Sequence, residues 1–183
     1  MNIMNVLNFL GFVDFTSTIW NLVAYAGMVV ILFGVKSKNY RPHLIGFGAV
    51  ILTFFAFLFL RDYILTSLQL LIAISGVLEI FGVNKKVSTT IFSVLSAVLF
   101  ITLIFGGYVP DALRWLGVFG ALGIAFGLIF VPHRLGFVSM ALGGALLVIY
   151  APFVGAWVFF FLNLIFTILN LQMVMRLNKE QPI

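Results

Sequence analysis

The sequence predicts an all-α polytopic membrane protein in which seven transmembrane helices form two parallel three-helix repeats joined by a linker helix. Three observations lead to this fold class. The 183 residues are 63% hydrophobic and only 8% charged, whereas soluble domains are about a quarter charged. The apolar runs are long enough to span a bilayer, and one six-residue pattern occurs twice along the chain.

We expect the first segment, residues 1–17, to lie at the membrane interface. It carries a helical stripe of apolar residues but also several polar ones, and it lacks the basic start of a signal peptide. The stripe consists of Ile3, Val6, Leu7, Leu10 and Val13.

Seven apolar runs follow, each close to the roughly 20 residues that a spanning helix needs. They cover residues 18–35, 43–60, 62–83, 87–109, 111–130, 134–150 and 152–175. The sixth run is short, so we expect it to stand nearly upright or where the bilayer is thin. None of the runs shows the alternating polarity of a barrel strand.

Basic residues mark one side of the membrane. They cluster in every second loop, whereas the other side holds only Arg61 and Arg114, each near an aspartate. Because Lys and Arg collect in cytoplasmic loops, this asymmetry predicts an outside N-terminus and a cytoplasmic C-terminus. The clustered residues are Lys36, Lys38, Arg41, Lys85, Lys86, Arg134, Arg176 and Lys179.

Two hexamers, Pro42–Phe47 and Pro132–Phe137, share their Pro, His, Gly and Phe positions and contain the only 2 histidines. Superposing them places the turn at residues 60–62 on residues 150–152 and leaves the fourth run without a counterpart. This predicts a first repeat at 18–86, a linker helix at 87–110, a second repeat at 111–176 and a cytoplasmic tail at 177–183.

In topology, this arrangement resembles the SWEET sugar facilitators and the wider PQ-loop group over nearly the whole chain. Those families carry a proline, typically Pro-Gln, within the first helix of each three-helix bundle. Here the first helices have no proline, and the repeated pair is Pro-His at the start of the following helix, at Pro42-His43 and Pro132-His133. The resemblance implies the same 3+1+3 order and an outside N-terminus.

The third helix of each repeat carries a polar stripe, formed by Gln69, Gly76 and Glu79 in one and by Asn163, Thr167 and Asn170 in the other. Polar groups inside a membrane usually face a bundle interior or a watery cavity, so the stripes predict a substrate path between the repeats. The alternative is that they hydrogen-bond neighbouring helices, for about 0.6 kcal/mol each.

Glu79 is the only carboxylate placed inside a predicted span and away from its ends. It is a candidate proton carrier, or it pairs with Lys85 or Lys86 near the interface, which is the interpretation we prefer. His43 and His133 are expected at the cytoplasmic ends of their helices, either as interfacial residues or as pH-sensitive gating groups. Their predicted positions argue against a shared haem.

Small residues predict one close helix pair. Gly123 and Gly127 in the fifth run have small-xxx-small spacing, and Gly143-Gly144 in the sixth run is the expected partner.

The sequence favours a transporter of a small polar solute, with or without a coupled proton. The alternative is a non-catalytic integral subunit or scaffold of a larger membrane complex. We expect no enzymatic activity and no cofactor or metal, because the common nucleophile, phosphate-loop and zinc motifs are missing and there is no Cys. The net charge of +5 is explained by the cytoplasmic loops, so the expected partners are lipid, a solute and membrane proteins, including further copies of the chain, and not nucleic acid.

Overall fold

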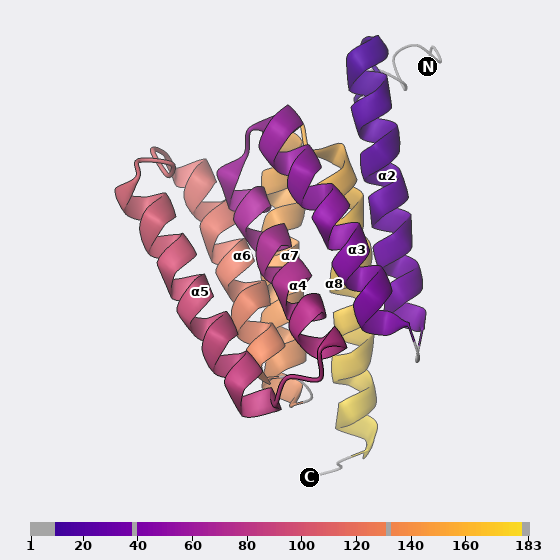
Figure 1. Cartoon of the computed structure of the whole chain (residues 1–183), viewed down its shortest axis with the longest axis vertical. Coiled ribbons are helices and arrows are strands. Elements are labelled where there is room, and N and C mark those ends of the chain that lie inside the picture. The colour runs from indigo at the N-terminus through magenta and orange to yellow at the C-terminus, as the bar shows by residue number, and fades with distance from the viewer. Residues whose placement is uncertain (1–9, 38–39, 131–132, 181–183) are drawn as a thin grey trace.

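The computed structural model describes residues 10–37, 40–130 and 133–180, which are helical apart from short connections. Seven of its helices are long and apolar enough to cross a membrane, so the chain is a multi-pass integral membrane protein. Successive helices run in opposite directions, so that α2 begins and α8 ends at opposite ends of the bundle (Figure 1). The elements are α2 (Phe15–Lys36), α3 (Arg41–Phe54) with its π-helical continuation η1 (Phe55–Leu60), α4 (Tyr63–Ile80), α5 (Lys85–Phe105), α6 (Ala112–Phe130), α7 (Arg134–Phe153) and α8 (Trp157–Glu180).

Four helices, α2, α4, α6 and α8, begin at one end of the bundle, which we call the N-terminal end. Three of them begin with an aspartate. Asp14 caps α2 in a capping box with Ser17, and Asp62 caps α4. Asp111 accepts a hydrogen bond of 2.8 Å from the backbone N–H of Arg114 at the start of α6. A carboxylate at this position satisfies free N–H groups and complements the helix dipole. The opposite end, where α3, α5 and α7 begin, is the C-terminal end.

The helices pack as two units joined in a ring. In the first unit α3 lies between α2 and α4, and in the second α7 lies between α6 and α8. Contacts of α4 with α6 and of α2 with α8 close the ring, while α5 packs outside it against α4 and α6 (Figure 1). Outward faces carry large exposed apolar side chains, as at Val94, Phe119 and Leu142, which suits contact with lipid.

Glycines bring neighbouring helices into backbone contact. A Cβ built on Gly123 would lie 2.9 Å from the Cα of Gly143, so α6 and α7 approach as closely as glycine allows. The predicted partnership of these two helices is therefore confirmed. Gly144 faces the other way, against the Thr167 hydroxyl of α8. In the first unit, a Cβ on Gly76 would lie 2.9 Å from the Cα of Gly46.

Both ends of the chain differ from the predicted boundaries. Most of the predicted interfacial segment, residues 1–9, lies outside the described residues, and α2 already begins at Phe15. The side chain of Asn21 donates to the carbonyl oxygens of Gly11 (3.0 Å) and Ser17 (2.9 Å), which ties the preceding turn to the helix. At the other end α8 continues to Glu180, into the predicted tail.

The predicted turn at residues 150–152 is wrong. α7 continues through Pro152 to Phe153, and the chain turns at Gly155, which has φ +70°. Pro152 lies in the last turn of α7, where it has no N–H to continue the helical hydrogen bonds, and the left-handed Gly155 follows shortly after the helix ends. The sixth span is consequently 20 residues long and not short.

Candidate functional site

The most distinctive polar group of the bundle is the buried carboxylate of Asp62. Only 2% of this residue is exposed, and its Oδ1 accepts hydrogen bonds from the backbone N–H groups of Ile64 (3.0 Å) and Leu65 (2.9 Å). The chain reaches this position through η1 and through Arg61, whose left-handed φ of +53° reverses its direction. A non-glycine residue in this conformation is uncommon and marks a tightly determined turn.

The second carboxylate oxygen joins Asp62 to the other unit. The hydroxyl of Tyr150, on α7, donates to Oδ2 at 2.5 Å, and Nη1 of Arg114, on α6, lies 3.7 Å from the same oxygen. Tyr150 is fully buried, and its ring fits because residue 117 is glycine: a Cβ there would lie 2.9 Å from the ring. We call Asp62, Tyr150 and Arg114 the Asp62 cluster.

Aromatic side chains extend this junction. Phe55 of η1 stacks on Phe59 (ring centroids 5.4 Å apart) and on Phe159 of α8 (6.2 Å). Trp20 of α2 stacks on Phe59 at 6.1 Å. These four rings, which we call the aromatic layer, come from both units and fill the ring of helices near its N-terminal end.

The chemistry of the Asp62 cluster is that of a satisfied internal anion. Burying a carboxylate is costly unless hydrogen bonds and a countercharge compensate. Here two backbone N–H groups, one hydroxyl and one guanidinium surround it. The arrangement can hold two units together, and it can release them if one partner withdraws.

Four predicted path residues have buried polar atoms that no neighbouring helix satisfies. The Oε1 atom of Gln69 and the hydroxyl of Thr167 have no hydrogen-bond partner. Asn163 and Asn170 donate to carbonyl oxygens one turn back in their own helix, at 2.8 and 2.7 Å. Among the described residues, none of the four hydrogen-bonds to another helix, so the interhelical alternative gains no support from these contacts.

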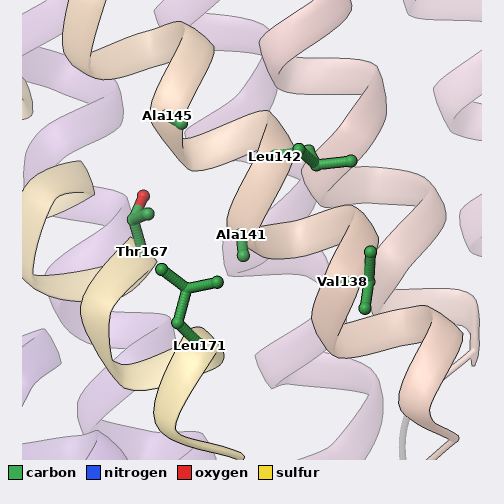
Figure 2. A pocket seen from close by; sticks show the side chains of 6 residues that line it. All are labelled: Val138, Ala141, Leu142, Ala145, Thr167 and Leu171. Atoms are coloured by element: carbon green, nitrogen blue, oxygen red, sulfur yellow. The ribbon is translucent and has the colours of Figure 1, made fainter. Parts of the chain in front are cut away.

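The two predicted stripes do not meet. α4 and α8 do not pack against each other within the described part of the chain. Gln69 lies on the same helical face as Gly76, which contacts Gly46 of α3. Thr167 contacts Gly144 of α7 and also lines an outward pocket between α7 and α8 (Figure 2). Each stripe is thus directed at least partly toward the middle helix of its own unit.

Glu79, His43 and His133 lie apart from the buried polar residues. Glu79 is exposed near the end of α4. Both histidines are exposed at the C-terminal end of the bundle, in or beside the first turns of α3 and α7. No group of three His, Asp or Glu side chains able to hold a metal occurs among the described residues.

Sequence reasoning missed the Asp62 cluster. It treated Asp62 and Arg114 only as charges at a membrane surface. A signal was present in the superposed hexamers, because they align Tyr150 with Leu60 and so place it at the same depth as the 60–62 turn.

No protein-family model, curated protein or solved structure matches this chain.

Proposed function

We propose that the protein moves a small polar solute, with or without a coupled proton, between its two three-helix units. The observation that carries this proposal is the set of buried polar side chains without interhelical partners at Gln69 on α4 and at Asn163 and Asn170 on α8. Buried polar groups in membrane spans are costly and usually face a partner or a watery path. A solute passing along these helices would offer hydrogen-bond partners to these side chains.

The packing supports motion of the units as bodies. Glycine contacts lock α6 to α7 and α3 to α4, whereas the units meet where α4 packs on α6 and α2 on α8, at the Asp62 cluster and where Phe55 stacks on Phe159. This pattern is reciprocal, because the third helix of each unit contacts the first helix of the other. It is the pattern expected of parallel repeats related by an axis along the membrane normal, which move against each other in alternating access.

In this proposal the Asp62 cluster and the aromatic layer form a gate that is closed at the N-terminal end. Opening that end requires Asp62 to separate from Tyr150 and Arg114, and Phe55 to leave Phe159. The gate would face outside if the orientation follows the positive-inside rule.

Solute flux into proteoliposomes tests the path. The flux is measured as the rate of liposome swelling in a panel of neutral solutes such as glycerol, monosaccharides and nucleosides. Asn163→Leu and Asn170→Leu are expected to lower flux per folded molecule by about 5- to 150-fold, because losing a hydrogen bond inside a low-dielectric site costs about 1–3 kcal/mol. Gln172→Leu, an exposed polar position on the same helix, is the matched control and is expected to leave flux unchanged. Normal flux in both asparagine variants would remove these residues from the path.

The orientation is tested by cysteine labelling, which is direct because the sequence has 0 Cys. Single cysteines at Pro110 and Lys86, both exposed and at opposite ends of α5, are expected to react with an impermeant maleimide from opposite sides. Pro110 should label in intact cells and Lys86 only after permeabilisation. The reverse result would invert the topology.

The competing function is a non-catalytic subunit of a larger membrane complex. The exposed apolar surface of α5 is compatible with a protein neighbour as well as with lipid. Purification under mild conditions distinguishes the two: obligate co-purification with unrelated subunits and no flux would support the subunit, whereas a lone chain or a homo-oligomer with flux would support the transporter.

A further inference from the structure

An apolar pocket lies on the outer face of the second unit, between α7 and α8. Its volume is about 180 Å³. Leu142 and Leu171 at its rim are 64% and 48% exposed, so the pocket opens away from the protein core and toward the acyl chains of the bilayer. Its lining residues, shown in Figure 2, are Val138, Ala141, Leu142, Ala145, Thr167 and Leu171.

Arg134 lies on the same face of α7 as three of the residues that line this pocket. Arg134, Val138, Ala141 and Ala145 are spaced by four, three and four residues, which places them on one face of α7. Arg134 is the first residue of the helix and is exposed. The structure gives it no acidic partner among the described residues.

The distances along the helix match a lipid. At about 1.5 Å of rise per residue, the pocket extends from about 6 to about 16 Å beyond Arg134. One leaflet of the hydrocarbon core is about 15 Å deep. A headgroup held at Arg134 would therefore place an acyl chain alongside α7 at the depth of the pocket.

We propose that this face is a binding site for one anionic phospholipid, with its phosphate at Arg134 and one acyl chain in the α7–α8 pocket. The guanidinium can hold two phosphate oxygens at once, which fixes the headgroup in a way that a point charge does not. Ala141 and Ala145 leave space that larger side chains would fill. The acyl chain therefore packs against the protein by dispersion contacts. A lipid of net negative charge is preferred over a zwitterionic one because it complements the positive charge of Arg134 without adding a competing cation.

The test is native mass spectrometry of the full-length protein equilibrated with equal amounts of palmitoyl-oleoyl phosphatidylglycerol and phosphatidylcholine. The parent protein is expected to retain phosphatidylglycerol preferentially. Arg134→Gln should lower that preference about fivefold, since one basic residue near the membrane surface contributes about 1 kcal/mol toward anionic lipid. Arg41→Gln is the matched control, because Arg41 is the exposed first residue of α3 at the same end of the bundle.

The pocket is tested separately by Ala145→Phe, which fills it from an exposed position. This variant is expected to lower retention of phosphatidylglycerol at least about threefold while leaving the protein folded, because the chain loses its packing surface. Ala97→Phe, at an exposed position on α5, is the control for Ala145→Phe. If Ala145→Phe does not fold, Ala145→Leu is used in its place.

Three results would overturn the site. One is equal retention of the two lipids by the parent protein. Another is an equal loss of preference in Arg41→Gln and Arg134→Gln, which would mean that the whole basic end attracts anionic lipid without a site. The last is unchanged retention of phosphatidylglycerol in the variants at residue 145, which would show that no acyl chain occupies the pocket.

Discussion

Replacing Asp62 with alanine is expected to destabilise the protein by about 2–4 kcal/mol. Loss of the helix cap on α4 costs about 1 kcal/mol. The buried hydroxyl of Tyr150 loses its acceptor, which costs a further 1–3 kcal/mol or so. Arg114 adds little, because its side chain is 33% exposed and can turn to water. Reversible unfolding of the purified protein in mixed micelles measures the change.

Two substitutions separate the cap from the junction between units. Asp62→Asn retains an N-cap oxygen and a polar partner for Tyr150, so it is expected to lose less than half as much as the alanine variant. Asp111→Ala removes a cap from an exposed position at the same end of the bundle and should cost only about 1 kcal/mol. If Asp62→Ala were no worse than Asp111→Ala, the bond to Tyr150 would contribute nothing to joining the units.

The spans were predictable because their signals are local. Run length and hydropathy located all seven spans, and glycine spacing correctly paired α6 with α7. Pro152 misled the prediction for an equally local reason: proline usually ends a helix, and only the three-dimensional structure shows that the last turn of α7 accommodates it.

The Asp62 cluster could not be predicted in the same way. Asp62 and Tyr150 are 88 residues apart, and their contact depends on how two units face each other across the ring. The burial of Asp62 depends on the same arrangement, because hydropathy places it in a polar turn at the membrane surface. Glu79 lies within a predicted span by sequence, and the structure places it exposed near the end of α4.

The Asp62 cluster and the glycine contacts have different consequences for a moving protein. The units are joined by the Asp62 cluster, the aromatic layer and the packing of α4 on α6 and α2 on α8, and they can separate with a smaller loss of contacts than α6 and α7. A helix pair in backbone contact along its length cannot slide without steric overlap, because packed interfaces are not continuously deformable. The proposed motion should therefore occur between the units and leave α6 fixed on α7.

Replacing Gly143 with alanine tests that rigidity and is expected to destabilise the protein by about 2 kcal/mol. The new Cβ would lie 2.5 Å from the carbonyl oxygen of Gly120 and 2.6 Å from the backbone nitrogen of Ile124, both main-chain atoms that cannot rotate away. Overpacking of this kind costs about 1–3 kcal/mol, and any separation of α6 from α7 adds to that cost. The better helix propensity of alanine offsets at most about 1 kcal/mol of it.

Gly46→Ala is the matched control for Gly143→Ala, since both are helical glycines at a helix contact. The nearest atom to a Cβ at residue 46 is 3.7 Å away, an ordinary contact, so alanine there should be neutral or stabilise by up to about 1 kcal/mol through its better helix propensity. Both variants are measured by the same unfolding experiment in mixed micelles. Equal stabilities for the two would show that α6 and α7 can part at little cost, and the second unit would then not move as one body.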